Sequence, residues 1–572
     1  MSKMNKKTVM KISTLILSIF LILVSITSAL FCENYTININ NLDEEQWYTL
    51  FAPQSSFTTY LINYNKEVVH TWESDYFPGH SAYLLENGNL LRTAFLGAHP
   101  VFLSGGMGGG VQEIDCNGTV IWDFKYSSDT YLSHHDIKRL SNGNTLMIAW
   151  ELKNNTEAVS AGRNPNSIPM LGLWPDHVIE VVPTGPTSGD IVWQWHVWDH
   201  LIQDYDPLKE NYGVVEDHPE LIDINFGKVA SDWNHINSID YNEEFDQIIL
   251  SVRNFNEIWV IDHSTTTEDA AGHTGGNSGK GGDILYRWGN PIAYGAGTKD
   301  DQKFFGQHDA RWIDTGCPGE GNILVFNNGL GRPGSSYSSV DEIVPPVDSN
   351  GSYYLETDSA YGPEEPIWIY TAENPTDFYA YMISGAQRIA SGNTVICDGK
   401  KGVFFEVTYE KETVWQYTNP YPNQLLNTVF KIETYPSNYS GLVNLLQQPN
   451  KPERPTGKTN GGIGIEYNYT SSTTDPQNDQ IYYMFDWGDK SDSGWIGPYN
   501  SGETINSSHI WKRRGNYNIK VIAKDIYGHQ SDWSDPLEIS LPKNKILTNP
   551  LKIKPVENHL KIFQLLRIFF QY

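Results

Sequence analysis

The chain has 572 residues, and its 40 basic against 68 acidic side chains give a formal charge of −28. Aromatic residues make up 13% of the sequence, which excludes a disordered chain, and the acidic balance excludes a general nucleic-acid binder because phosphate and protein repel each other. A single apolar run of membrane-spanning length excludes a polytopic membrane protein, and the chain is longer than the roughly 100–200 residues of one domain.

The apolar run lies at the N-terminus. Four lysines between residues 3 and 11 precede the uncharged stretch 12–31, and small residues close it at 27–29. This pattern predicts residues 1–30 as a secretory signal peptide or a signal anchor. The rest of the chain is then extracytoplasmic, either secreted or attached to the membrane at the cell surface by this segment.

Two kinds of segment alternate from about residue 55 to 420. One is a strand that ends in tryptophan, such as 111–124 and 403–417, and the other is a hairpin on an Asn-Gly type of turn, such as 80–94 and 134–151. Six copies of the tryptophan segment predict an all-β fold, a six-bladed β-propeller over residues 31–445. Five to eight blades, an all-β sandwich and a β-solenoid are the alternatives.

The composition changes near the C-terminus. Residues 446–457 are a polar, proline-rich linker, and 458–541 predict a small β-sandwich that resembles PKD or immunoglobulin-like domains in the segments FDWGD and HIW…GNYNIKVIAKD. The tail 542–572 is basic and predicts an amphipathic helix or an anchor for a partner. The four cysteines form no CxxC pair, which excludes a zinc ribbon and leaves their pairing open.

Histidines recur at one register of the hairpins. His80, His135 and His235 each lie seven residues before the asparagine of a turn, His308 lies likewise before a longer turn, and Ser384 holds this position in the fifth hairpin. Equivalent positions of propeller blades face one axis, so we expect these side chains to meet in the central channel. The alternative is that they are packing or turn residues.

Polar neighbours strengthen the prediction of a site. Arg253 ends the strand that returns beside His235, Asn237 follows that histidine by two positions, Asp309 follows His308, and Asn328 lies on the strand that returns from it. Several imidazoles could bind a metal, but an arginine is a poor neighbour for a cation. An anion site, in which cationic donors hold a transferring group that a neutral imidazole attacks, is the other interpretation.

Three segments together resemble the arylsulfotransferase family: HHDIKRLSNGNTL, NHINSIDY…ILSVRN and GQHDARWID…GNILVFNNG. The resemblance implies a six-bladed propeller that moves a sulfuryl group from a phenolic sulfate ester to a phenolic acceptor. It implies a transiently sulfated histidine, no nucleotide sulfate donor, no cofactor and no metal.

The motifs assign roles to individual residues by the same resemblance. His308 matches the nucleophile, and His135 matches the acid or base, with His134 as its fallback. His235, Asn237 and Arg253 match the residues that hold the sulfate oxygens. We further expect His80, Asn328 and Asp309 to bind substrate.

Two other functions stay open from the sequence. One is a non-enzymatic cell-surface propeller that binds carbohydrate or protein, and the other is a histidine metalloenzyme. Four aromatic side chains are candidates for holding the aryl groups, with core packing as the alternative: Trp150, Phe304, Phe305 and Phe326.

Overall fold

The computed structural model describes residues 47–357 and 359–542, which form a nearly all-β protein. The chain divides into two compact units, the first ending at Val443 and the second beginning at Asn444. The predicted signal segment 1–30 and residues 543–572 of the predicted tail lie outside the described residues. Within the described part, no helix is long and apolar enough to cross a membrane.

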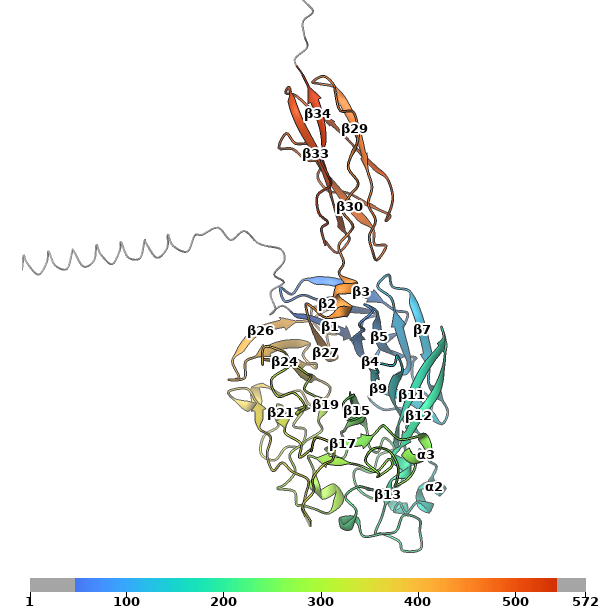
Figure 1. The fold of residues 1–572 in the computed structure, drawn as a ribbon. Coiled ribbons are helices and arrows are strands. Elements are labelled where there is room, and N and C mark those ends of the chain that lie inside the picture. Colours follow the sequence, from blue (N-terminus) through green and yellow to red (C-terminus); the bar gives the residue numbers. More distant parts are fainter. Residues whose placement is uncertain (1–46, 358, 543–572) are drawn as a thin grey trace, which may run out of the picture. The chain divides into compact units, whose positions relative to one another are not determined.

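Six antiparallel sheets of four or five strands build the first unit (Figure 1). The first sheet joins both ends of this unit: β1 (Trp47–Pro53), β2 (Thr58–Ile62), β3 (Val68–Glu73) and β27 (Val429–Pro436). The second and third sheets follow it: β4 (Phe77–Leu84), β5 (Leu90–Phe95), β6 (Gly109–Ile114) and β7 (Val120–Lys125), then β8 (Ser127–Ser128), β9 (Tyr131–Arg139), β10 (Thr145–Glu151), β11 (Asp176–Gly185) and β12 (Ser188–His196).

The other three sheets come from the second half of the unit. They are β15 (Ile236–Asn242), β16 (Gln247–Val252), β17 (Glu257–Asp262) and β18 (Tyr286–Trp288); β19 (His308–Trp312), β20 (Ile323–Asn327), β21 (Ser339–Ile343) and β22 (Trp368–Tyr370); and β23 (Gly385–Arg388), β24 (Thr394–Asp398), β25 (Val403–Val407) and β26 (Thr413–Thr418). Connections carry the parallel pair β13 (Leu201–Ile202) and β14 (Ile222–Asp223), the helices α2 (Asn155–Ser160), α3 (Thr267–Ala270) and α4 (Ser440–Leu445), and five short 3₁₀ turns: Pro165–Ser167, Val197–Asp199, Val215–Asp217, Pro291–Tyr294 and Pro375–Asp377.

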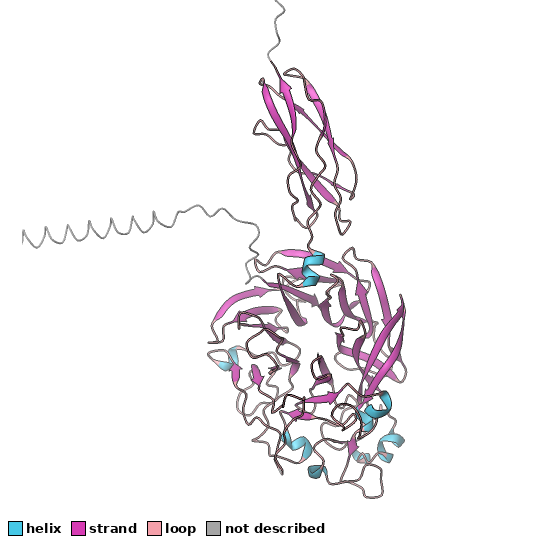
Figure 2. Ribbon diagram, viewed as in Figure 1, coloured by secondary structure: helices cyan, strands magenta, loops and turns pink. Residues whose placement is uncertain are grey.

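The sheets form a closed ring through one strand each. Strands β4, β9, β15, β19 and β23 contact one another in this order, and β27 contacts both β23 and β4. Figure 2 shows these strands around a common centre, with the remaining strands of each sheet outside them. The ring closes because β27 pairs with β1, so residues about 380 apart in sequence share one sheet: Phe51 lies opposite Ile432.

Asn-Gly turns explain the regular inner hairpins. After β4, the Gly88 N–H donates to Leu85 O and the Leu85 N–H to Asn89 O, at 2.9 and 2.8 Å. The turn needs a left-handed residue, which glycine supplies without steric cost: Gly88 has φ +87°. Gly143 repeats this conformation after β9, with φ +88°. The turns predicted from the sequence are therefore present, and they set the spacing from turn to histidine.

Tryptophans tie neighbouring sheets together. Each outermost strand carries a buried tryptophan at this position, namely Trp72, Trp122, Trp193, Trp288, Trp368 and Trp415, and β12 carries a second one, Trp195. The Trp122 indole N–H donates to Ser188 O of the next sheet at 3.0 Å, and Trp368 donates to Tyr409 O at 2.8 Å. Trp415 closes the circle by donating to Tyr64 O at 2.8 Å. The aromatic repeat of the sequence thus packs between sheets, where the indole N–H groups of the other tryptophans find an acceptor, whereas the Trp72 indole nitrogen is buried without a hydrogen-bond partner among the described residues.

The second unit contains two small sheets. One is formed by β28 (Thr456–Gly457), β29 (Glu466–Ser471) and β32 (Ile505–Ile510), and the other by β30 (Ile481–Asp486), β31 (Ile496–Tyr499), β33 (Gly515–Asp525) and β34 (Leu537–Leu541). A single apolar cluster joins them, centred on Trp487, Trp511 and Phe485. Along β30 the side chains alternate between buried and half-buried, which is typical of a sheet with one face on a core.

His263 links the third and fourth sheets and makes stability depend on pH. Its Nδ1 lies 2.7 Å from Asp246 Oδ1 and its Nε2 lies 3.1 Å from Glu180 Oε2. Burial alone would lower the pKa of His263, but the hydrogen bonds and charges of the two carboxylates outweigh burial and raise it to about 9. The stabilisation is therefore complete below the unfolded pKa of about 6.5 and is lost as the pH rises through about 9.

We expect His263→Gln to lower the free energy of unfolding by about 2–3 kcal/mol at pH 6 and by much less near pH 9.5. Urea unfolding of both proteins at the two pH values measures the difference. His218→Gln is the control, because the His218 side chain is 47% exposed. An equal loss for His263→Gln at both pH values would contradict the linkage.

Candidate active site

Four imidazoles meet at one end of the inner strands. His80 lies in β4 and His135 in β9, while His235 immediately precedes β15 and His308 begins β19. The ring centre of His135 is 5.3 Å from that of His80 and 4.6 Å from that of His235. The structure therefore brings together residues that the sequence places 55 to 228 positions apart.

Phe430 of β27 completes the cluster. Its ring stacks on His80 at 4.8 Å between centres, and it lies 5.9 Å from His135 and 6.2 Å from His308. The sixth inner strand thus supplies an apolar wall at the position where four other inner strands supply an imidazole. The sequence does not predict Phe430, because no Asn-Gly turn follows it to reveal the register.

Hydrogen bonds fix the tautomer of His308. Its Nδ1 lies 2.7 Å from Asn328 Oδ1 and 3.2 Å from Gly306 O. The Asn328 amide is oriented because its Nδ2 donates to Ala380 O and Ile383 O, at 2.7 and 2.8 Å. Both neighbours of Nδ1 are therefore acceptors, so Nδ1 carries the proton and Nε2 keeps its lone pair. The Ile383 N–H donates to that Nε2 at 3.2 Å.

A carboxylate orients His235 in the same way. Asp232 Oδ2 lies 2.5 Å from His235 Nδ1 and also accepts from Ser104, while Asp232 Oδ1 accepts from the Trp150 indole at 3.0 Å. The N–H of the imidazole is then on Nδ1, and Nε2 is left for a ligand. Asp232 was not predicted, although it lies only three residues before His235 in SDWNHIN.

His135 rests on a second histidine. Its Nδ1 lies 2.8 Å from His134 Nδ1, and His134 Nε2 lies 2.7 Å from Asp176 Oδ1. His134 also stacks on Trp150 at 4.0 Å between ring centres. All of these side chains are buried. His134 therefore positions His135 through this contact. Trp150, a predicted aryl-binding candidate, packs against His134.

The cluster favours neutral imidazoles. Burial, with the charge of His235 as the next cause, lowers the pKa of His80 to about 4. Burial also holds the pKa values of His134, His135 and His308 well below the ordinary value, and Arg253 adds to the effect at His308. These rings are therefore uncharged at neutral pH, and the imidazole nitrogen of His308 is available as a nucleophile.

Arg253 lines a small cavity next to the histidine cluster. A hollow of about 240 Å³ is lined by Lys228, Arg253, Asn256, Gln302, Phe305, Gly306, Leu330 and Gly331, with no carboxylate among these described residues. Gly306, which lines this cavity, accepts a hydrogen bond from His308 Nδ1 through its carbonyl oxygen. The cavity therefore adjoins that imidazole. Although the chain has 68 acidic side chains, the charged residues that line this cavity are the cations Lys228 and Arg253, so the cavity attracts an anion. Phe305 alone among the predicted aryl-binding candidates lines it, since Phe304 and Phe326 are fully buried in the core.

Three predicted contacts have other partners. Asn237 donates its Nδ2 to Gln307 O at 2.8 Å, so it braces the strand that carries His308. Asn328 orients His308 as described, and Asp309 faces Arg311 at 2.9 Å and Lys431 at 3.2 Å. Asn328 thus positions the imidazole and Asp309 belongs to a charge cluster, while a contact of either side chain with substrate stays a prediction.

That charge cluster lies directly after the histidines in sequence. Lys431 Nζ contacts Asp136 Oδ2 at 2.9 Å, Asp309 Oδ1 at 3.2 Å and Glu433 Oε1 at 3.6 Å, and Arg311 pairs with Glu433 at 2.7 Å. All five side chains are at most 12% exposed. The residues that follow His135, His308 and Phe430 thus form a second layer, which we call the charge layer.

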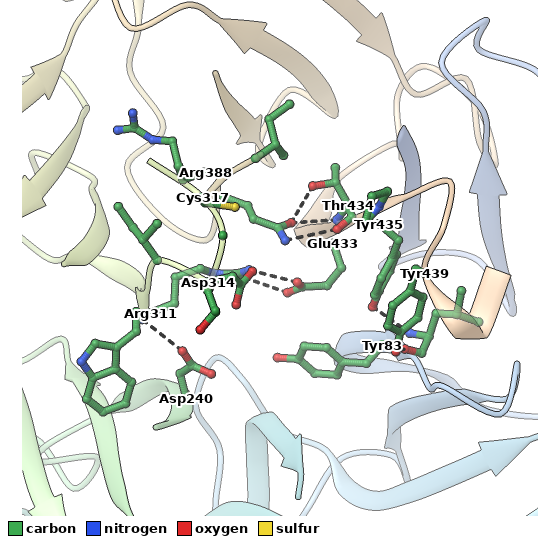
Figure 3. Close-up of a pocket in the computed structure, with 18 of the residues that line it drawn as sticks. Tyr83, Asp240, Arg311, Asp314, Cys317, Arg388, Glu433, Thr434, Tyr435 and Tyr439 are labelled. Carbon is green, nitrogen blue, oxygen red and sulfur yellow. Dashed lines mark hydrogen bonds and ion pairs between the residues drawn. The ribbon is translucent and has the colours of Figure 1, made fainter. Parts of the chain in front are cut away.

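A larger cavity lies on the other side of the charge layer. It has about 1670 Å³ and is lined by the turn ends of the inner strands, including Tyr83, Lys138, Asp240 and Asp314, together with Arg311 and Glu433 of the charge layer. Figure 3 shows the two ion-pair contacts from Arg311 to Glu433 in it and the Tyr83 side chain beside them. None of the four clustered histidines lines this cavity. Carboxylates outnumber cations in its lining, so it is the less favourable approach for an anion.

Two groups of side chains in the described residues have converging metal-type ligand atoms. They are His200 with His273 and Asp283, and Asp475 with Asp479 and Asp525, each within 4.8 Å. Both nitrogens of His200 already face acceptors, Asp283 Oδ1 and Ala270 O, each at 2.9 Å. The four clustered imidazoles belong to neither group. Neither Cys317 nor Cys397 forms a disulfide.

Comparison with known proteins gives one family. A family model described as arylsulfotransferase (ASST) matches residues 86–439. No curated protein matches the chain. Among solved structures, the PKD domain of an M14-like peptidase from Thermoplasmatales archaeon SCGC AB-540-F20 is 48% identical, over 17% of this chain and 98% of that one, with a TM-score of 0.16. A protein of unknown function from Bacteroides caccae is 12% identical, over 68% of this chain and 98% of that one, with a TM-score of 0.37.

Proposed function

This chain belongs to the arylsulfotransferase family, and from that premise we propose that it moves a sulfuryl group from a phenolic sulfate ester to a phenolic acceptor through a sulfated His308. The family implies aryl sulfate and phenol substrates. The proposed reaction uses no nucleotide sulfate donor. It has two displacements at sulfur and therefore ping-pong kinetics.

One observation carries the proposal: Asn328 and Gly306 hold the proton of the His308 imidazole on Nδ1, so Nε2 keeps its lone pair, and the ring adjoins a cavity that contains Arg253. In the first displacement the Nε2 lone pair forms an N–S bond while the bond from sulfur to the aryl oxygen breaks. In the second, the acceptor oxygen attacks sulfur and the N–S electrons return to His308. The Ile383 N–H, 3.2 Å from Nε2, is released as the bond forms and can then donate to a sulfuryl oxygen.

The other residues of the cluster stabilise the charge that spreads over the sulfuryl oxygens. Sulfuryl transfer, like phosphoryl transfer, depends mainly on positioning and on donors aimed at these oxygens. Arg253 supplies the permanent cation, and His235 and His80 line the same end of the ring. His135 protonates the departing phenolate and later accepts the proton of the acceptor phenol.

The charge distribution supports an approach from the Arg253 side. Lys228 and Arg253 line the small cavity without a carboxylate, whereas the large cavity is acidic and separated from the imidazoles by the charge layer. An anionic sulfate ester is attracted to the first opening and repelled by the second. Phe305 lies in the first opening and is the proposed contact for the aryl ring.

The same proposal covers the architecture and the setting of the enzyme. The closed ring of β4, β9, β15, β19, β23 and β27 supports a six-bladed β-propeller. Residues 458–541, within the second unit, are proposed as a PKD- or immunoglobulin-like module, on the strength of FDWGD and the two small sheets. Residues 1–30 are proposed to export the chain or to hold it at the cell surface.

Trapping the intermediate tests the proposal. After incubation with an aryl sulfate and no acceptor, we expect mass spectrometry to find one added SO₃ group on the peptide that contains His308, and we expect an acceptor phenol to remove it. Peptides that contain His200 or His263 are internal controls, because these imidazoles lie outside the cluster and pair with other side chains. Transfer without any labelled histidine, or a label on another residue, would overturn the assignment of His308. The absence of transfer would favour a non-enzymatic binding role.

A further inference from the structure

The acid step poses a problem of proton supply. The departing phenolate needs a proton from His135, yet burial and the surrounding histidines hold the pKa of His135 well below its ordinary value. An imidazolium at that position is therefore scarce at neutral pH. A neutral imidazole can still donate its Nε2 proton, provided that another group replaces the proton at Nδ1.

The side chains behind His135 form a continuous line to a carboxyl group. His135 Nδ1 lies 2.8 Å from His134 Nδ1, a separation that holds one shared proton, and His134 Nε2 lies 2.7 Å from Asp176 Oδ1. Asp176 is fully buried, and His134 and His135 are 2% and 3% exposed. Trp150 holds the middle ring by stacking on it. No other role in the reaction is assigned to His134 or Asp176.

We propose that Asp176, His134 and His135 form a proton relay, in which the carboxyl group stores the proton that the leaving phenolate takes and the acceptor phenol returns. The inference rests on the proposed function. In the first half-reaction the His135 Nε2 proton goes to the phenolate, the His134 Nδ1 proton moves to His135 Nδ1, and the Asp176 proton moves to His134 Nε2. The second half-reaction reverses all three transfers, so the cycle balances without an imidazolium.

The surroundings of Asp176 suit a stored proton. Burial is the main cause that raises the pKa of Asp176 well above its ordinary value, and the charges of Asp232 and Glu151 add to it. The backbone N–H groups of Ile236 and His235 oppose this shift. The short contact from His134 Nε2 to Asp176 Oδ1 is bent away from an aligned hydrogen bond, so the last transfer requires a small rotation of the carboxyl group.

Asp176→Asn separates proton storage from packing. The amide oxygen can keep the Ile236 N–H, which now donates to Asp176 Oδ2 at 3.2 Å, and the NH₂ group can face His134 Nε2. The variant thus copies protonated Asp176 without a proton to release. In single-turnover measurements without an acceptor, which follow the first half-reaction alone, we expect release of phenol from unsubstituted phenyl sulfate, whose phenolate is a poor leaving group, to fall about 100-fold or more. Release of nitrophenol from nitrophenyl sulfate, whose phenolate leaves unprotonated, should change by less than about threefold.

The control is Asp283→Asn, since Asp283 forms a buried pair with His200 outside the cluster. We expect Asp283→Asn to change the rates with phenyl sulfate and nitrophenyl sulfate by the same factor. If Asp176→Asn lowers both donors equally, or neither, the relay is overturned; a wild-type chain inactive on both donors overturns the proposed function instead. His134→Gln breaks the same line one residue nearer the site and repeats the test if Asp176→Asn does not fold.

A second readout does not depend on turnover. In the absence of substrate at neutral pH, the infrared difference between wild type and Asp176→Asn should contain the carbonyl band of one protonated carboxylic acid. Loss of that band in His134→Gln is not expected, because the proton is stored on Asp176. A wild-type chain that shows the band of an ionised carboxylate at this position would overturn the relay even if sulfuryl transfer is found.

Discussion

Replacing His308 with alanine should reduce sulfuryl transfer from an aryl sulfate by about a thousandfold or more, because it removes the nitrogen that we propose receives the group. The structure gives this imidazole a fixed tautomer through Asn328 and Gly306 and buries it to 3% exposure. Initial rates with a chromogenic donor and mass spectrometry of the histidine peptides measure the two consequences, namely lost turnover and lost SO₃ label.

The activities of the variant and the wild type can be compared only if both proteins are folded. His308→Gly leaves a cavity at the ring position, and added imidazole should restore part of the donor half-reaction because it supplies the missing nucleophile. Thermal unfolding of each variant verifies the fold, and His218→Ala serves as the matched control for loss of an exposed histidine. Normal turnover in His308→Ala would remove this residue from the role of nucleophile.

Replacing Lys431 with methionine should destabilise the first unit by about 3–5 kcal/mol, because it leaves buried carboxylates without their cation. Lys431 is 4% exposed and lies within 3.6 Å of Asp136, Asp309 and Glu433. Burial alone would lower the pKa of Lys431, but these carboxylates raise it, so the side chain is charged throughout the accessible range. Urea unfolding at neutral pH measures the loss.

Lys401→Met is the matched control. Lys401 pairs with Asp398 at 2.8 Å, but its side chain is 52% exposed, so its removal should cost less than about 1 kcal/mol. Adding Asp309→Asn to Lys431→Met should recover part of the stability, since one uncompensated charge disappears. Equal losses for the two lysines would show that the charge layer does not act as a buried ion cluster.

Much of the candidate site follows from the sequence because the turns fix the register. His80, His135 and His235 each lie seven residues before the asparagine of a hairpin turn, so the turn predicts their position. The hairpin of β15 and β16 returns the chain to the end where His235 lies, which places Arg253 beside it. The tryptophan repeat likewise marks one strand per sheet. These are local relations, in which one short segment determines both the turn and the position of its partner.

The remaining parts depend on contacts between distant segments. Phe430 and Lys431 belong to β27, which pairs with β1 across almost the whole unit, so no local pattern reveals their register. Asp176 lies in β11, and no motif in that segment predicts that it contacts His134. The ion pairs of Asp309 with Arg311 and Lys431 are not evident from the sequence, because side chains do not alternate simply at this point: Asp309 has φ +52°, as does His135.

The pairing of β27 with β1 has a consequence for how the protein is made. The ribosome releases β1 early, and this strand can pair with β2 at once, but it gains its second neighbour, β27, only after residue 436 has been synthesised. Until then the ring of sheets stays open between β4 and β23. Phe430 and Lys431 arrive on the same late strand. The candidate site is therefore completed only when β27 pairs with β1, and a chain that terminates before residue 429 would carry all four clustered histidines and still lack Phe430 and Lys431.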